Sequence, residues 1–309
     1  MRVLFWGTPD FALPAFRALT DEGHQVVGVV TQPDRPAGRG RGTAMSPVKE
    51  VAVAEGIPVL QPERARGPEF MDRVRALDPE LSVVVAYGQI LRPEILELPP
   101  RGSINLHASL LPELRGAAPI QWAVIRGYEV TGVTIMRMEA GLDSGPMLFR
   151  VEEPIRSDES ASELAARLSE IGAEALIETL ALMEAGTLLE VPQDHDRATY
   201  APKLDRGVAR LDWTLPAREV ARWIRGLDDV PGACSPLGDR GPVKLFRPRV
   251  EPRPGEPGRV LDADPRAGVL VACGEGAVWI TEVQPPGKRR MTAGEWVRGR
   301  GIAVGERFG

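Results

Sequence analysis

Four short apolar segments in the first 108 residues most constrain the fold of this chain. Several are near-continuous apolar runs, which is typical of strands buried on both faces of a parallel sheet. Segments with helical signals lie between them, and this alternation predicts an open α/β sheet. The expected strands are Arg2–Trp6, Gln25–Thr31, Leu81–Ala86 and Ile104–Ala108.

Capping signals locate two of the intervening helices. Ser46 followed by Pro47 is an N-cap with a first-turn proline, and Gly56 stands where that helix should end. Ser160-Ala-Ser-Glu163 has the spacing of a capping box, in which the serine and glutamate side chains each bind the other residue's backbone N–H. An apolar stripe at helical spacing follows this box and predicts a long amphipathic helix.

A polar stretch divides the chain. Residues 190–205 carry two prolines and lack periodicity, so we interpret them as a linker between domains at 1–189 and 206–309. Beyond the linker, one short helix precedes several short strand candidates separated by Gly and Pro, which suggests a small β-barrel; an oligonucleotide-binding (OB) type is one option. The strand candidates are Val243–Phe246, Gly258–Leu261, Val269–Cys273 and Ala277–Val283.

Composition limits the class of protein. No apolar run approaches the ~20 residues of a membrane span, and the first residues resemble a strand rather than a signal peptide. The two cysteines, Cys234 and Cys273, form no ligand motif. We therefore expect a reduced cytoplasmic protein without structural disulfides or a metal site.

The net charge of −5 conceals an asymmetry. Residues 205–309 contain 18 Lys and Arg against 14 Asp and Glu, a net charge of +4, and the rest of the chain is acidic. A basic part on an acidic protein indicates a polyanionic partner. A solvated basic face without a partner explains the charge equally well.

Polar side chains interrupt the fourth apolar segment. Asn105 and His107 are two residues apart on the expected strand, so both point to the same face. Asp143 follows in a Gly-Leu-Asp-Ser-Gly turn. An amide, an imidazole and a carboxylate in one pocket can bind a carbonyl and move protons, as acyl transfer to an amine requires. The alternatives are a core histidine for His107 and a turn-forming aspartate for Asp143.

The turn after the first strand lacks the glycine pattern that binds nicotinamide dinucleotides. A dinucleotide-binding fold carries G-x-G-x-x-G at this place, but here Gly7 is followed by Thr8 and Pro9. A nicotinamide dehydrogenase is therefore disfavoured.

Two basic loops remain. Residues 31–42 contain Arg35, Arg39 and Arg41 among three glycines and two prolines, which is long for a plain connector. Lys288, Arg289 and Arg290 follow a Pro-Pro-Gly turn. Both loops could contact a phosphate backbone, and the alternative for the first is a disordered surface loop.

Five motifs in the first half of the chain stand out together: Asn105–His107, Ser109–Pro112, Arg115–Gln121, Gly132–Met136 and Leu142–Gly145. Together they resemble the folate-dependent formyltransferase family. Three further features narrow this resemblance to the members that act on methionyl-tRNA: the opening Gly7–Ala12, the loop Thr31–Gly40, and Leu211-Asp-Trp213 with Ile224–Leu227. The resemblance covers nearly the whole chain.

The resemblance implies a donor, 10-formyltetrahydrofolate, and an acceptor, the free amine of initiator methionyl-tRNA. It implies catalysis by Asn105, His107 and Asp143, no metal, and a monomer. It also implies a Rossmann-like domain followed by an OB-like barrel, with Arg39 as the key residue of a tRNA-inserting loop. The implied folate contacts are Ser109, Leu110, Leu111 and Pro112, with Tyr87, Gln89, Ile90 and Leu91 near the pterin.

Two rival functions stay open on sequence alone. A formyltransferase acting on a small amine would share the three polar residues, but it would not explain the arginine loop or the basic second domain. A nucleic-acid-binding protein with an inactive α/β domain would not explain the intact triad.

Overall fold

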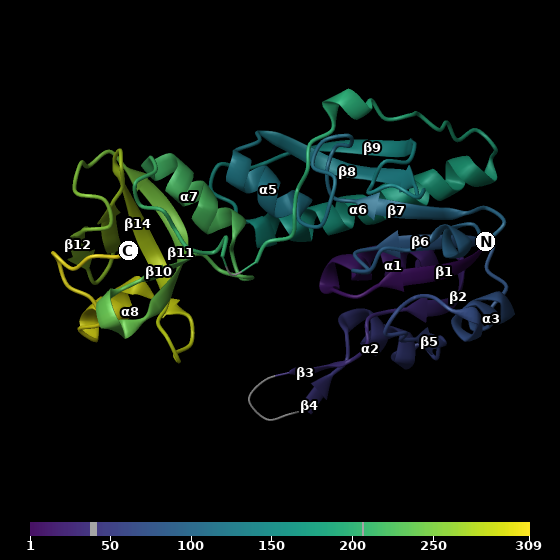
Figure 1. The fold of residues 1–309 in the computed structure, drawn as a ribbon, viewed down its shortest axis with the longest axis horizontal. Coiled ribbons are helices and arrows are strands. Elements are labelled where there is room, and N and C mark those ends of the chain that lie inside the picture. Colours follow the sequence, from purple (N-terminus) through teal and green to yellow (C-terminus); the bar gives the residue numbers. More distant parts are fainter. Residues whose placement is uncertain (38–41, 206) are drawn as a thin grey trace. The chain divides into compact units, whose positions relative to one another are not determined.

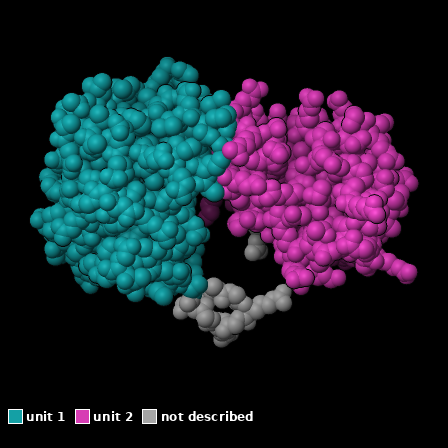
Figure 2. All heavy atoms as spheres, turned by 180° about the vertical axis from the view of Figure 1, so that it is seen from behind, with its two compact units in different colours: residues 1–119, 130–154, 165–201 teal, residues 120–129, 155–164, 202–309 magenta. Residues whose placement is uncertain are grey.

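The computed structural model describes residues 1–37, 42–205 and 207–309. The chain forms two compact units, coloured separately in Figure 2. Unit 1 comprises residues 1–119, 130–154 and 165–201, and unit 2 comprises residues 120–129, 155–164 and 202–309. The segment interpreted as a linker thus groups with unit 1 as far as Ala201. The expected division into two domains, at 1–189 and 206–309, stays a prediction.

A mixed seven-stranded sheet organises unit 1, in the order β5-β2-β1-β6-β7-β8-β9 (Figure 1). Pairing is parallel from β5 to β7 and antiparallel beyond β7. All four expected strands are present, and the mostly parallel α/β sheet is confirmed. The strands are β1 (Arg2–Gly7), β2 (Gln25–Val30), β5 (Val59–Leu60), β6 (Leu81–Val85), β7 (Ser103–His107), β8 (Val130–Arg137) and β9 (Met147–Pro154).

The helices begin where the capping signals indicate. Lys49 donates its backbone N–H to the Ser46 hydroxyl at 3.2 Å. Ser160 and Glu163 form the predicted reciprocal bonds, 2.8 and 3.3 Å long, and the bond from the Ser160 backbone is the largest cause that lowers the pKa of Glu163. The α-helices as far as residue 184 are α1 (Leu13–Asp21), α2 (Pro47–Ala54), α3 (Pro68–Ala76), α4 (Pro93–Leu96), α5 (Pro119–Arg126) and α6 (Ala161–Glu184).

Apolar packing explains why the central strands are near-continuous hydrophobic runs. Leu4 and Trp6 of β1 are fully buried in a cluster with Val84 of β6 and with Phe70 of α3. The Trp6 ring meets the Tyr87 ring edge-on at 5.2 Å. This packing fixes β1 and β6, and β6 pairs with β7, the strand that carries the polar residues described below.

Part of the arginine-rich connector forms a two-stranded ribbon, β3 (Arg35–Ala37) with β4 (Gly42–Ala44). In Figure 1 this ribbon extends away from α2. Arg35 is exposed at its start. Arg39 and Arg41 lie outside the described residues.

Unit 2 is built around an antiparallel sheet in the order β10-β11-β14-β13-β12, with β15 paired to β14. Helix α7 (Ala217–Gly226) packs on it through Val220 and Ile224, both fully buried. Closure into an OB-like barrel stays a prediction. The other elements are β10 (Cys234–Pro236), β11 (Pro242–Glu251), β12 (Val260–Asp264), β13 (Gly268–Ala272), β14 (Ala277–Gln284), β15 (Met291–Thr292) and α8 (Ala293–Arg298).

Among the helices of the described residues, none has the length and apolar content to cross a membrane.

Candidate active site

Strand β7 carries two of the three predicted catalytic side chains. Asn105 pairs with Val84 of β6 and Met136 of β8, and His107 ends the strand opposite Thr134. Their two-residue separation places both side chains on one face. In open α/β sheets, ligands bind beyond the carboxyl ends of the parallel strands, and His107 lies at such an end.

His107 is held by its ring nitrogens. Its side chain is 6% exposed, and Nε2 lies 3.0 Å from the Leu114 carbonyl oxygen. A carbonyl oxygen only accepts hydrogen bonds, so Nε2 must carry a proton. Nδ1 then faces Oδ2 of Asp143 at 3.8 Å, which is an ion-pair distance but longer than a hydrogen bond. The histidine and aspartate, 36 residues apart in the sequence, therefore do meet.

Asp143 sits in an uncommon backbone conformation, with φ of +48°. Its Oδ2 accepts the backbone N–H of Gly116 at 2.8 Å, and its side chain keeps 19% exposure. Gly116 has φ of +118°, and a Cβ there would lie 2.7 Å from the Ala201 carbonyl oxygen. Only glycine fits this approach, so Gly116 is required to bring the amide to the carboxylate.

The Asn105 amide is different because it is uncommitted. The side chain is half-buried, and it makes no hydrogen bond within the described part of the chain. Its polar atoms are not among the buried side-chain atoms that lack a partner in the described residues, so solvent reaches them and a bound molecule can replace that water. Asn105 thus offers donors and an acceptor to a bound molecule on the face it shares with His107.

The segment after β7 is fixed by Thr134 of β8. Its hydroxyl donates to the Ser109 carbonyl at 2.7 Å and accepts the Leu111 backbone N–H at 3.1 Å. Ser109 donates its own hydroxyl to the Glu113 carbonyl at 2.6 Å. Ser109, Leu111 and Pro112 are buried and Leu110 is partly exposed. The predicted folate-contacting segment is therefore rigid backbone adjacent to His107.

The second predicted folate segment follows β6. The Tyr87 carbonyl accepts hydrogen bonds from Thr8 and Gln32, each 3.2 Å long. The Tyr87 ring is buried, which raises the pKa of its hydroxyl. Gln89 is tied through its side chain to residues 63 and 65, and Leu91 is buried. Ile90 is 88% exposed, which leaves an apolar side chain available to a ligand.

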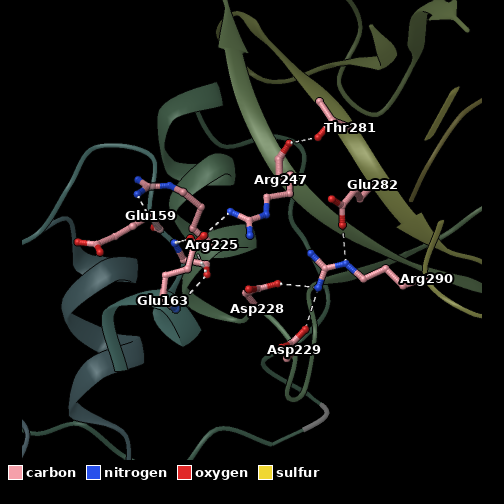
Figure 3. Close-up of polar contacts among 10 residues, drawn as sticks. Glu159, Glu163, Arg225, Asp228, Asp229, Arg247, Thr281, Glu282 and Arg290 are labelled. Atoms are coloured by element: carbon pink, nitrogen blue, oxygen red, sulfur yellow. Dashed lines mark hydrogen bonds and ion pairs between the residues drawn. The ribbon is translucent and has the colours of Figure 1, made fainter. Parts of the chain in front are cut away.

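The C-terminal basic loop divides into two kinds of residue. Lys288 and Arg289 are exposed. The Arg290 guanidinium reaches three carboxylates: Glu282 at 2.7 Å, Asp229 at 2.8 Å and Asp228 at 3.4 Å (Figure 3). It also lies 3.9 Å from the centre of the Phe246 ring. Phosphate binding by Arg290 stays a prediction, but this side chain already has anionic partners.

We expect Arg290→Ala to destabilise unit 2. Asp228, whose side chain is only 8% exposed, would lose a charged partner. Because Arg290 itself is 30% exposed, solvent screening reduces the loss below that of a fully buried pair, and we expect about 1–2 kcal/mol. Urea unfolding measures this loss. The double variant Lys288→Ala with Arg289→Ala is the control, and equal stability of both variants would contradict the structural role.

Comparisons with known proteins show which family the chain belongs to. A family model described as formyl transferase matches residues 1–180, and one described as formyl transferase, C-terminal domain, matches residues 203–301. A methionyl-tRNA formyltransferase of Symbiobacterium thermophilum is 49% identical over 100% of this chain and 95% of its own length. The chain belongs to the methionyl-tRNA formyltransferase family. Another relative with this name, from Acetivibrio thermocellus, is 46% identical over the full length of both chains.

Solved structures show the same fold at lower identity. HypX from Aquifex aeolicus, in complex with tetrahydrofolic acid, aligns with a TM-score of 0.70 at 20% identity, over 98% of this chain and 48% of its own. The sugar 3N-formyltransferase WlaRD aligns with a TM-score of 0.68 at 14% identity, over 94% and 99% of the two chains. At these identities the alignments support the formyltransferase fold alone.

Sequence reasoning misses two residues next to the predicted triad. The sequence shows Arg115 only as part of a motif, and it places Gln193 in a stretch that resembles a linker. Both are buried, with 4% and 6% exposure, and they bond to each other. Gln193 has no local signal, because its partners lie 48 to 78 residues away.

Proposed function

We propose that this protein transfers the formyl group of 10-formyltetrahydrofolate to the free amino group of initiator methionyl-tRNA. The product is N-formylmethionyl-tRNA, which serves translation initiation. The observation that carries the proposal is the uncommitted Asn105 amide on the same strand face as His107, whose Nδ1 faces Asp143, in a chain that matches methionyl-tRNA formyltransferases over its full length.

The chemistry follows from what each group can donate or accept. The methionyl amine attacks the formyl carbon while neutral, so a new C–N bond forms and the carbonyl oxygen gains negative charge. When this intermediate collapses, the bond between the formyl carbon and N10 breaks. Tetrahydrofolate then leaves with a proton on N10 in place of the formyl group, which balances the proton that the amine loses. Asn105 donates a hydrogen bond to that oxygen and requires no rearrangement of other protein bonds to do so. Fixed donors aimed at developing charge are among the largest contributions to catalysis.

His107 acts through Nδ1, because Nε2 is committed to the Leu114 carbonyl. When protonated, Nδ1 is a second donor to the developing oxyanion. Asp143 stabilises that imidazolium and accepts the proton that leaves the amine, directly or through water. The 3.8 Å separation between Nδ1 and Oδ2 is longer than a hydrogen bond, so neither atom is committed to the other and both stay available to the substrate.

The donor site uses the two loops after β6 and β7. Backbone groups and apolar side chains there can hold a flat heterocycle between them. The proposed contacts are Tyr87, Gln89, Ile90, Leu91, Ser109, Leu110, Leu111 and Pro112.

The acceptor tRNA binds mainly through phosphate contacts. The basic C-terminal part supplies salt-dependent affinity, and an OB-type barrel there is a known scaffold for nucleic acid. Cytoplasmic location and a monomeric state complete the proposal. The proposed tRNA contacts are Arg35, Arg39, Arg41, Lys288, Arg289 and Arg290.

A formyl-transfer assay with competing acceptors tests this function. Purified protein receives 10-formyltetrahydrofolate with initiator methionyl-tRNA, elongator methionyl-tRNA, or small amines such as amino sugars. We expect formylation of the initiator tRNA with preference over the elongator. Preferential formylation of a small amine, or tetrahydrofolate release that does not depend on charged tRNA, would overturn the proposal.

We expect Arg39→Ala to impair the use of tRNA more than the binding of folate. The loop belongs to the part of the chain that carries the triad, so its arginine is suited to the acceptor stem rather than to distant phosphates. The measurement is kcat/KM for methionyl-tRNA beside KM for the folate donor, with Arg17→Ala on α1 as an exposed control. An effect confined to the folate parameters would refute the assignment.

A further inference from the structure

The Asp143 turn needs external support. Its φ of +48° is uncommon for a residue other than glycine, and such conformations persist when the surrounding structure holds them. The carboxylate itself has one protein hydrogen bond in the described chain, from the Gly116 amide. Something else must therefore fix the backbone on either side of Asp143.

Gln193 supplies that support. Its Nε2 donates to the carbonyl oxygens of Asp143, at 2.9 Å, and of Gly145, at 2.7 Å. Its Oε1 accepts Nε and Nη2 of Arg115, at 3.1 and 2.7 Å. Arginine only donates and carbonyls only accept, so the partners fix the orientation of this amide. One side chain thereby binds both carbonyls of the turn.

Arg115 anchors the amide from the other side. Arg115 is a nearly fully buried cation. Its side chain donates to two acceptors in the described chain, Gln193 Oε1 and His195 Nδ1, and neither acceptor is a carboxylate. A charged donor strengthens the bond to the Gln193 oxygen. Backbone bonds hold Arg115 in turn: its N–H donates to the Thr199 carbonyl at 2.9 Å, and its carbonyl accepts the Ala201 N–H at 2.7 Å.

Residues 191–201, the segment that contains Gln193, also contact Leu114, whose carbonyl binds His107. The Thr199 hydroxyl accepts the Leu114 N–H at 2.9 Å, and the Leu114 carbonyl is the group that binds His107 Nε2. At its other end, Val191 exchanges two backbone bonds with Met147, 2.8 and 2.9 Å long. Residues 191–201 therefore contact the supports of both His107 and Asp143.

We propose that residues 191–201 position the His107–Asp143 pair, and that Gln193 is the positioning residue that sets where the Asp143 carboxylate lies. The inference rests on the proposed roles of His107 and Asp143 in formyl transfer. Gln193 does not touch the reacting atoms; it acts through the turn. Small displacements of a proton acceptor slow transfer strongly, because catalysis depends on near-attack geometry.

The decisive variant is Gln193→Glu. Glutamate has the same shape and still accepts from Arg115, but its second oxygen faces the carbonyls of Asp143 and Gly145, which it repels. We expect kcat to fall about 10- to 100-fold, KM for both substrates to change less than about threefold, and the pH profile of kcat to shift. Gln25→Glu, an exposed position at the start of β2, is the matched control and should match the parent enzyme.

A double-mutant cycle separates positioning from general stability. If Gln193 acts through Asp143, then adding Gln193→Glu to Asp143→Asn should cost less than about threefold in kcat, whereas independent effects multiply. Full multiplication would overturn the proposal, as would a single variant with kcat within twofold of the parent or with only KM changed. If Gln193→Glu does not fold, Gln193→Met, which is neutral and of similar length, is judged by the same criteria. Inactivity of the parent enzyme on methionyl-tRNA would refute the proposed function instead.

Discussion

Asn105→Ala should reduce kcat for formyl transfer about 100-fold or more, with little change in stability. Removal of one preorganised donor to a developing oxyanion typically costs about 100- to 1,000-fold in rate. Stability should be preserved because the Asn105 amide has no protein partner in the described chain, so truncation leaves no group unpaired. Steady-state kinetics with initiator methionyl-tRNA and thermal unfolding measure the two effects.

An isosteric variant sharpens this prediction. Asn105→Asp keeps the shape of the side chain but replaces the donor by a negative charge, which repels an oxyanion. We expect it to be at least as slow as the alanine variant, which a purely steric role for Asn105 does not predict. Near-normal turnover of either variant would remove Asn105 from the mechanism.

Local patterns predict the elements that local forces determine. The four apolar segments form β1, β2, β6 and β7, because short apolar runs suit strands buried on both faces and are too short for typical helices. The Ser160–Glu163 box forms because its bonds span three residues. In the same way, the alternation around Asn105 and His107 predicts their shared face.

Contacts between residues that are distant in the sequence cannot be predicted from local patterns. The meeting of Asp143 with His107 depends on which strands become neighbours, and only the family resemblance leads one to expect it. Gln193 illustrates the limit: a polar residue between prolines looks like a linker, yet it is buried against the Asp143 turn. The ribbon β3–β4 escapes prediction because strands of three residues carry no periodic signal.

The basic loop at 288–290 shows a further limit of charge counting. Sequence alone gives three equal cations, but the fold surrounds Arg290 with carboxylates from other elements and leaves its two neighbours exposed (Figure 3). Net charge predicts a partner's sign and not which side chains reach it. To assign individual phosphate contacts, each variant must therefore be measured for both its stability and its affinity for tRNA.

Asp143→Asn should lower kcat about 100- to 10,000-fold, the range in which a positioned general acid or base contributes. The change is conservative in structure, because an asparagine oxygen can still accept the Gly116 N–H and the backbone bonds to Gln193 remain. What disappears is the negative charge facing His107 Nδ1. That loss makes the imidazolium less favourable and leaves the proton of the attacking amine without an acceptor.

Thermal unfolding distinguishes these two losses from a folding defect. The variant should unfold at about the same temperature as the parent, because the bonds from Gly116 and Gln193 remain. Asp21→Asn, an exposed residue at the end of α1, is the matched control and should retain the parent rate. An Asp143→Asn enzyme with a rate within tenfold of the parent would show that the proton leaves by another route, and that the 3.8 Å contact with His107 serves the fold alone.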